Sequence, residues 1–333
     1  MKLSVLDLVP VVEGGTFSQA LASAAELART AEQLGYHRYW VAEHHGMAGI
    51  GGAATSVVLA HVGHATSTIR IGAGGIMLPN HNPLVIAEQF ATLDALFPGR
   101  IDLGLGRAPG ADQRIVSALR KDVNRAAEHF PDDVVEIQLQ FAGDPRLPLQ
   151  ATPGAGAAVE MWILGSSLFG AQLAAMLGLP YAFASHFAPS QLDEAIRTYR
   201  EKFQPSAVLD KPHVMAAMNI FAADTEAEAE LIASSMDQSF IALRTGTPGK
   251  LAPPVAGYRD SLPPEMLRTL RAMRHASAIG TPDMVGEAIA AFARRTGADE
   301  LILAGSTFDP AARLRSLELT MQAVGQATGA LIA

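Results

Sequence analysis

The sequence predicts an α/β fold: a (β/α)8 TIM barrel with an extended loop before the eighth strand. Short β-rich runs alternate with longer segments of helical periodicity along the 333 residues, and eight such runs can be counted. Alternation of strand and helix implies parallel strand pairing, and eight parallel units close naturally into a barrel. A doubly wound open sheet is the alternative.

Each strand candidate is rich in aliphatic residues and stops at glycine, proline or a polar cluster, as buried strands do. In chain order the candidates are residues 3–9, 38–43, 69–78, 100–106, 160–165, 181–185, 213–223 and 299–305. Between the last two lies the segment 245–266, which is dense in Pro and Gly and far longer than an ordinary connection. We interpret this segment as a lid or a surface excursion.

Helical periodicity fills the connections between strands. In residues 17–34, alanine and leucine recur at spacings of three and four, and residues 83–96 and 169–177 are further helix candidates. Gly35, Gly178 and Gly297 each end a helix where a left-handed residue is favoured before the next strand. No linker or low-complexity tract divides the chain, so we expect residues 1–333 to form one domain.

The composition narrows the function classes. With 49% hydrophobic and 17% charged residues, the chain has the material for a large core. Its net charge of −8 offers no basic surface to phosphate backbones or anionic lipids, so we expect neither nucleic-acid nor membrane partners. The chain has no cysteine, which removes disulfides and thiolate chemistry.

The N-terminal residues form a strand candidate rather than a secretory signal. A break at Pro10–Glu13 follows the apolar run, where a signal peptide would have its cleavage region. No apolar run approaches the ~20 residues that a membrane span needs. We therefore expect a cytoplasmic enzyme that acts on a small-molecule substrate.

Chemically versatile side chains follow the predicted strands, where a barrel carries its active site. After strands two to six come Glu43, His44 and His45; Asn80, His81 and Asn82; Arg107; Ser166 and Ser167; and His186. Neighbours in an extended chain point to opposite sides, so His44 and His45 are poorly placed to bind one ion, and no HExxH motif is present. We predict no metal, and either a proton-transfer role or simple hydrogen bonding at the rim for these histidines.

Two segments have the character of a phosphate site. Arg107 ends a glycine-rich strand, and a guanidinium can bind phosphate through two parallel hydrogen bonds. Ser166 and Ser167 precede a helix, whose free N–H groups and dipole favour an anion. The ordinary interpretations are a surface ion pair for the arginine and an N-cap for the serines.

Four stretches together resemble the bacterial luciferase-like flavin-dependent monooxygenase family, in particular its single-chain oxidoreductases. They are VAEHHG at 41–46, the block from Gly72 to Gly110, LGSSLFGAQLAAMLGLPYAFASHF at 164–187, and TGADELIL with FDPAARLRSLEL at 296–319. The resemblance runs nearly end to end. It implies a (β/α)8 barrel that binds reduced FMN, or in some branches the deazaflavin F420, at its C-terminal mouth.

The resemblance also implies roles for particular residues. His44 matches a histidine that assists proton transfer, and Arg107, Ser166 and Ser167 match the groups that bind the flavin phosphate. Gly74 and Gly75 match a pair that forms a non-prolyl cis peptide beneath the flavin ring. Two positions depart from the pattern.

The departures are Gly106, where luciferase has a reactive cysteine, and Gly170, where relatives often have a hydroxyl for the phosphate. Light emission is therefore not implied, and phosphate binding is expected to depend more on backbone N–H groups.

We accordingly predict a monooxygenase that uses reduced FMN and O2, through a flavin C4a-peroxide, to oxygenate a small organic substrate. The alternatives are an F420-dependent hydride-transfer oxidoreductase and a non-catalytic flavin-binding protein. No dinucleotide fingerprint follows a strand, so reduced flavin is expected from a separate NAD(P)H:flavin reductase. Relatives commonly dimerise through early barrel helices, so a homodimer is one expectation. The sequence leaves the oligomeric state and the substrate open.

Overall fold

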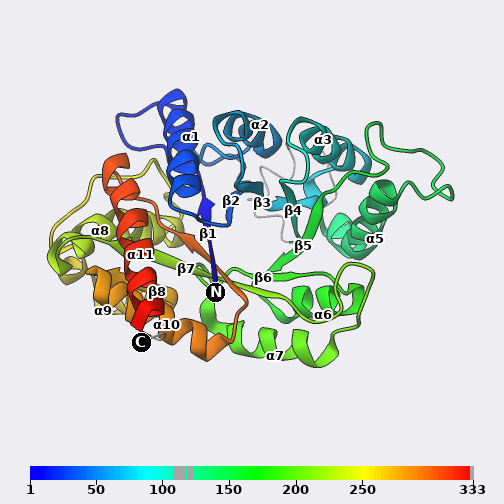
Figure 1. The fold of residues 1–333 in the computed structure, drawn as a ribbon. Helices are drawn as coiled ribbons and strands as arrows, with labels where there is room; N and C mark the ends of the chain where they lie inside the picture. The colour runs from blue at the N-terminus through cyan, green and yellow to red at the C-terminus, as the bar shows by residue number, and fades with distance from the viewer. Residues whose placement is uncertain (108–117, 119–122, 331–333) are drawn as a thin grey trace.

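The chain folds into a closed parallel β-barrel surrounded by helices, as the computed structural model shows for residues 1–107, 118 and 123–330 (Figure 1). Eight strands form the ring in the order β1-β2-β3-β4-β5-β6-β7-β9, and a β6–β7 pairing closes it. The strands are β1 (Lys2–Asp7), β2 (Arg38–Val41), β3 (Arg70–Met77), β4 (Ile101–Gly106), β5 (Glu160–Gly165), β6 (Tyr181–Phe183), β7 (Val214–Ala222), β8 (Ser277–Gly280) and β9 (Glu300–Ala304). The predicted TIM-barrel class is confirmed.

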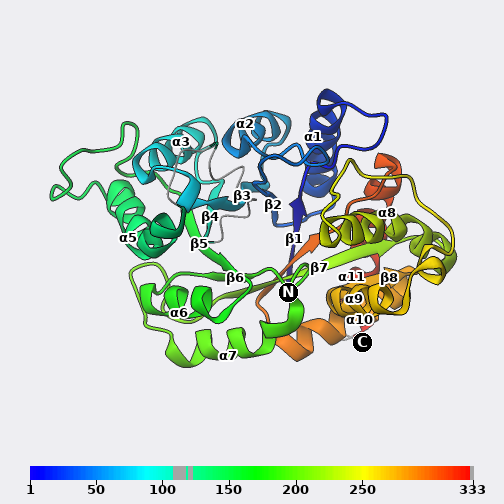
Figure 2. The ribbon, with the colours of Figure 1, turned by 180° about the vertical axis from the view of Figure 1, so that it is seen from behind.

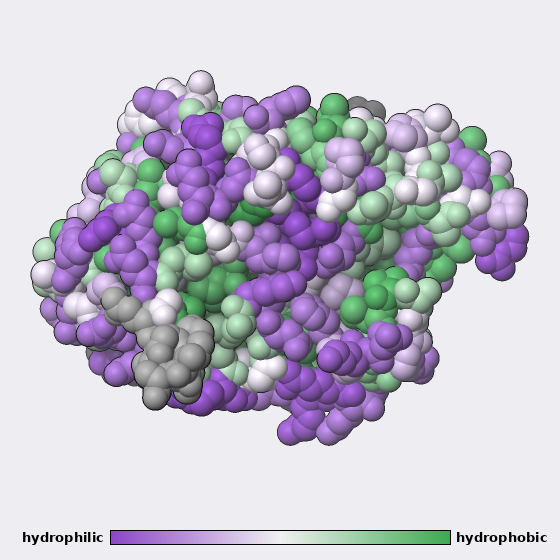
Figure 3. All heavy atoms as spheres, viewed as in Figure 1, coloured by the Kyte–Doolittle hydropathy of each residue, from purple (hydrophilic) through white to green (hydrophobic). Residues whose placement is uncertain are grey.

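The helices lie outside the ring (Figures 1 and 2). They are α1 (Phe17–Gln33), α2 (Thr55–Ala65), α3 (Pro83–Leu96), α5 (Val123–Ala142), α6 (Leu168–Leu177), α7 (Leu192–Lys202), α8 (Glu226–Arg244), α9 (Pro264–Met273), α10 (Pro282–Thr296) and α11 (Pro310–Ala330). Both views place α5 on the side of the barrel opposite the α8–α9 pair. The face of the molecule that Figure 3 shows has hydrophilic residues over much of its area, with patches of apolar residues between them.

Local sequence signals account for the helix ends. Thr16 and Gln19 form a reciprocal capping box at the start of α1, and Asn82 caps α3 ahead of Pro83. Gly178 and Gly297 end α6 and α10 with φ of 62° and 57°, the left-handed conformation expected of a glycine C-cap. The three helix candidates, 17–34, 83–96 and 169–177, agree with α1, α3 and α6.

One strand was missed by the sequence count. β8 is a four-residue strand in the long connection before β9, and it pairs with the C-terminal half of β7, from Asn219 to Ala222. β9 pairs with the preceding part of β7, so β8 adds to the barrel without belonging to the ring. A run as short as Ser277–Gly280 has too few residues for period-two alternation to stand out.

The N-terminal end of the barrel interior is filled by a buried ionic network. Arg38 donates hydrogen bonds to Asp102 Oδ2 (2.9 Å) and to Glu300 Oε1 (3.1 Å), and Trp40 Nε1 donates to the same Asp102 oxygen (2.8 Å). Burial opposes ionisation of Glu300, but the hydrogen bond from His213 and the charge of Arg38 lower its pKa to about 2. The network therefore holds charged partners together in the core of the barrel.

No helix in the described part of the chain is both long and apolar enough to cross a bilayer.

Candidate functional site

A cavity of about 680 Å³ opens at the C-terminal end of the barrel, a volume typical of small-molecule sites. Its wall is formed by β3 and β7 themselves, by the loops that follow β1, β2, β4, β5, β6 and β9, and by one side of α8. All six residues predicted for the site line this cavity: His44, Gly74, Gly75, Arg107, Ser166 and Ser167. The structure thus brings together residues that lie up to 123 positions apart in the sequence, from His44 to Ser167.

The glycine pair of β3 forms one face of the cavity. The Gly74–Gly75 peptide bond is cis, as the resemblance implies. A Cβ on Gly75 would lie 2.6 Å from the Gly104 carbonyl oxygen, and one on Gly74 would lie 2.8 Å from Leu6 Cδ1. Neither position has room for a side chain, so bare backbone faces the cavity.

A positive region lies where β4 and β5 end. Arg107 is exposed, and its guanidinium carbon lies 4.0 Å from the centre of the Phe169 ring on α6. Ser167 occupies the N-cap position of α6, yet its side chain makes no capping hydrogen bond. The hydroxyl and the first-turn N–H groups of α6 are therefore suited to an anionic ligand.

Gly170 lies in the first turn of the same helix and is buried. A Cβ at this position would lie 3.4 Å from both Gly165 Cα and Tyr181 Cε2. Both distances are ordinary van der Waals contacts, so a small side chain would fit here and packing does not explain the departure from the family pattern.

The two adjacent histidines have different surroundings. β2 ends at Val41, and beyond it His44 lines the cavity, whereas His45 Nε2 donates a hydrogen bond to Glu43 Oε1 at 2.7 Å. The Nδ1 atom of His44 is buried and has no hydrogen-bond partner among the described residues. Burial lowers the pKa of His44, and the nearby Glu43 only partly opposes this.

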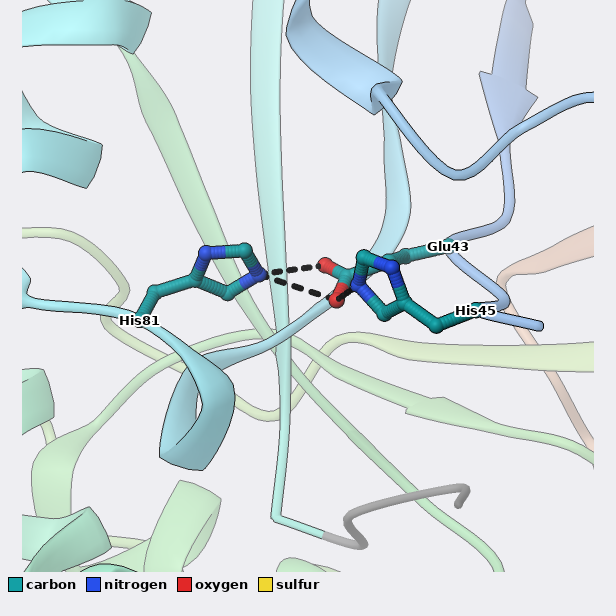
Figure 4. Close-up of side chains that lie close together, drawn as sticks. All are labelled: Glu43, His45 and His81. Carbon is teal, nitrogen blue, oxygen red and sulfur yellow. Dashed lines mark hydrogen bonds and ion pairs between the residues drawn. The ribbon is translucent and has the colours of Figure 1, made fainter. Parts of the chain in front are cut away.

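Glu43 lies between two imidazoles (Figure 4). Its carboxylate is within 2.9 Å of His81 Nε2 and 2.7 Å of His45 Nε2, and it accepts the Met77 N–H at 3.1 Å. Burial raises the pKa of Glu43, but the bonds from His81, Met77 and His45 outweigh it and the net pKa is lowered. The sequence placed Glu43 and His81 after neighbouring strands but did not predict that they meet.

The ligand atoms of Glu43, His45 and His81 lie within 4.8 Å of one another, a spacing that a metal ion could use. The two histidines that could bind one metal ion together with Glu43 are therefore His45 and His81, which lie on different loops, and not the adjacent His44 and His45. The Glu43 carboxylate already accepts hydrogen bonds from His45, His81 and the Met77 N–H. These bonds connect the loop after β2 to the loop after β3.

His186 is a cavity residue whose importance the sequence did not reveal. It follows β6, lines the cavity, and has a buried Nδ1 atom without a partner among the described residues. Its backbone carbonyl accepts a hydrogen bond from Asn219 Nδ2 at 2.8 Å. Burial, with a smaller contribution from His44, lowers the pKa of His186 to about 4.

The Pro/Gly-rich segment is bound across the cavity in this structure. Leu251 exchanges backbone hydrogen bonds of 2.9 Å with Val11 and Glu13, and Lys250 Nζ donates to the Gly15 carbonyl at 2.7 Å. Leu251 is buried, and it lines the cavity with Pro248 and Gly249. The segment is therefore a fixed part of the cavity wall here.

The sequence profile of the luciferase-like monooxygenase family matches residues 1–300. The chain belongs to this family. A luciferase-like monooxygenase of Escherichia coli K12 is 49% identical over 319 residues, which cover 96% of this chain and 95% of that protein. The N-acetyl-S-alkylcysteine monooxygenase of Bacillus subtilis is 35% identical over 260 residues, covering 74% and 75% of the two chains.

Solved structures of the family share this architecture. The crystal structure of apo-MsnO8 has a TM-score of 0.90 at 34% identity, covering 97% of this chain and 98% of that one. Two more distant structures, each at 18% identity and TM-score 0.70, show the same fold over 97% of this chain. One is the oxygenating constituent of 3,6-diketocamphane monooxygenase in complex with FMN, and the other is an F420-dependent secondary alcohol dehydrogenase with an F420-acetone adduct.

Proposed function

We propose that this luciferase-like protein is a monooxygenase that uses reduced FMN and O2 to oxygenate a small organic substrate. The observation that carries the proposal is one cavity that combines a bare glycine face, a cationic rim at a helix N-terminus and a partly buried imidazole. These three features suit, in turn, a flat ring, a phosphate and a proton transfer.

The described residues fit a flavin. Arg107 and the first turn of α6, with Ser166 and Ser167, would hold its phosphate, and Gly74 and Gly75 would lie against its ring because no Cβ intervenes. When bound, reduced FMN supplies the electrons that activate O2. The N-acetyl-S-alkylcysteine monooxygenase relative and the FMN-bound neighbour support this assignment.

His44 would manage the proton. Its Nδ1 atom is buried without an acceptor, so the tautomer that carries the proton on Nε2 is favoured, because a buried N–H without a partner is costly. The lowered pKa keeps the ring neutral near pH 7. The neutral ring would therefore donate a hydrogen bond from Nε2 to the bound reactants, and a proton would be transferred to them only from the imidazolium form, which takes up a proton from solvent between turnovers.

The wall built by Leu251 and its neighbours would exclude water. Its backbone pairing with residues 11–13 covers the cavity with apolar side chains, and exclusion of water prevents loss of oxidising equivalents as H2O2. The absence of a dinucleotide fingerprint in the sequence supports delivery of reduced flavin by a separate NAD(P)H:flavin reductase.

F420-dependent hydride transfer is the second candidate function, because an F420-dependent dehydrogenase shares the fold. The net charge of −8 disfavours the polyanionic tail of F420. A non-catalytic flavin-binding protein is the third candidate. The buried histidine in the cavity disfavours it, because a protein that only carries flavin needs no proton-transfer group.

Anaerobic titration with FMNH2 and with F420H2, followed by O2, separates the three. Under the proposal FMNH2 binds the protein and O2 then oxidises it through a protein-stabilised spectral species that the His44→Ala variant changes. Tight binding of F420H2 with weak binding of FMNH2 would establish the second candidate. Tight FMN binding with O2 reactivity equal to that of free FMNH2 would establish the third.

A further inference from the structure

The cavity has an apolar side that the flavin-binding residues do not occupy. Met236, Phe240 and Leu243 of α8, with Met273 at the end of α9, line it together with Phe187. This wall follows β6 and β7, on the side of the barrel opposite α5, whereas Arg107 follows β4 (Figures 1 and 2). The cavity is thus large and varied enough to accept a second, apolar molecule beside a cofactor.

Charge is scarce along this cavity. Glu43 and Arg107 are the only Asp, Glu, Lys or Arg side chains among its described lining residues. Glu43 is already engaged by His45 and His81, and Arg107 lies at the exposed rim. Arg244 packs on the Phe240 ring but is exposed and is not among the described lining residues, so those lining residues offer no cation to an anionic group beside the α8–α9 wall.

His186 is the imidazole placed to meet a ligand there, and the polar residues Asn219 and Ser239 also line the cavity. The His186 ring lines the cavity, its Nδ1 atom is enclosed without a partner among the described residues, and Asn219 fixes its backbone. A buried acceptor atom without a donor costs less than a buried N–H without an acceptor, so the Nε2–H tautomer is favoured. Burial lowers the pKa to about 4, so the ring is neutral near pH 7.

We propose that His186 positions the organic substrate by donating a hydrogen bond from Nε2 to a neutral oxygen, with the α8–α9 wall holding the apolar part. The ligand class is an uncharged, largely apolar molecule that carries one oxygen able to accept a hydrogen bond, and a ketone serves as its probe. A neutral donor does not offset the cost of burying a carboxylate, so the corresponding acid binds poorly. This inference rests on the proposed function only in calling the ligand a substrate.

The test compares three probes on the full chain, with and without FMN, by equilibrium dialysis and gas chromatography. The probes are 2-heptanone, its isostere 2-methyl-1-heptene, in which a methylene replaces the oxygen, and heptanoate. The alkene leaves water more readily than the ketone, so the quantity compared is the ketone-to-alkene affinity ratio in wild type and in the His186 variants. The donor is expected to raise this ratio about 3- to 10-fold, the size of one net hydrogen bond. Heptanoate is expected to bind at least about tenfold more weakly than the ketone.

His186→Leu removes the donor. We expect it to lower the ketone-to-alkene affinity ratio about 3- to 10-fold, because ketone binding weakens while alkene binding stays within about twofold. His186→Gln keeps an N–H donor and is expected to retain part of the preference. His64→Leu is the matched control, because His64 is exposed, packs edge-on against Phe97 and does not line the cavity.

Heptanoate binding by wild type as tight as its ketone binding would overturn the proposal. So would a His186→Leu variant, folded by circular dichroism, that weakens ketone and alkene binding equally, because a purely structural role predicts that result. Failure of FMNH2 oxidation would refute the proposed function but would leave this comparison standing, since binding of the probes involves no turnover.

Discussion

The two ends of the barrel interior treat buried polar groups in opposite ways. At the N-terminal end, Arg38 is bonded to Asp102 and Glu300, and Trp40 completes the carboxylate shell. At the C-terminal end, the Nδ1 atoms of His44 and His186 are enclosed without partners among the described residues.

The difference separates stability from ligand binding. A buried polar group that is fully bonded contributes to a unique, rigid core, whereas an unsatisfied one has a cost that a fold retains where a ligand can use the group. TIM barrels place chemistry at the C-terminal face, and this chain follows that division. Variants at the N-terminal end should change mainly stability, and variants at the mouth should change mainly function.

The largest functional loss is expected at His44. His44→Ala should slow single-turnover oxygenation by roughly 10²- to 10⁴-fold, as removal of a positioned acid does, with FMN affinity little changed. His45→Ala is the comparison, because His45 bonds Glu43 and does not line the cavity, and it should cost less than about tenfold. Stopped-flow measurement with a substrate identified by probe binding decides this, and equal losses would contradict the assignment.

The largest stability loss is expected at Arg38. Arg38→Ala leaves Asp102 and Glu300 buried without their shared cation, so the free energy of unfolding should fall by about 3 to 5 kcal/mol. Urea unfolding followed by circular dichroism measures it. Arg146→Ala removes only an exposed pair with Asp144 and should leave the midpoint unchanged. Unchanged stability in Arg38→Ala would break the comparison between the two ends.

The pH dependence of the free energy of unfolding tests whether the buried imidazole of His186 is neutral in the folded protein. Its pKa is lowered from 6.5 to about 4 by burial, so the unfolded chain binds a proton in this range that the folded chain does not. Stability should be full above pH 6.5 and fall as the pH drops from 6.5 towards 4, by at most about 3 kcal/mol. His186→Leu should flatten this slope in thermal unfolding curves, and an unchanged slope would show that other groups cause it.

Arg107→Ala should weaken FMN binding about tenfold. Charge-assisted bonds contribute about 1.5 to 3 kcal/mol, and the exposure of Arg107 places it at the lower end of this range. Fluorescence titration gives the Kd. Arg244→Ala is the matched control, because Arg244 is also exposed and also packs on an aromatic ring, Phe240, but on α8. Equal weakening in both variants would point to net charge and not to a phosphate site.

The smallest effect is expected at the segment that covers the mouth. Shortening residues 246–257 should raise the H2O2 released per flavin oxidised by a few-fold, because the wall formed by Leu251 is lost. Lys250→Ala removes only the bond to Gly15 and should act in the same direction more weakly, while Lys211→Ala, an exposed lysine away from the cavity, should not. Unchanged H2O2 yield would leave water exclusion to the other loops.

The prediction from sequence was most successful where the signal was local. Glycine caps at Gly178 and Gly297, the helix starting at Pro83 and the barrel class all rest on periodicity and turn chemistry that short segments carry. The sequence did not predict β8, because four residues are too few to show the alternation typical of a strand. Its strand conformation depends on pairing with β7. His186 was noted as a residue after a strand, but its buried, unpartnered Nδ1 has no sequence signal.

By itself, the sequence determined the alternation of strands and helices and, through the family resemblance, the six residues that line one cavity. Only the tertiary structure decided that His81 bonds Glu43 across 38 residues, that Arg38 bonds Glu300 across 262, and that His186 faces the same space as His44. The reason is physical. Propensities and caps act within a few residues, whereas the partner of a buried charge or imidazole depends on barrel closure and strand register, which the whole chain fixes at once.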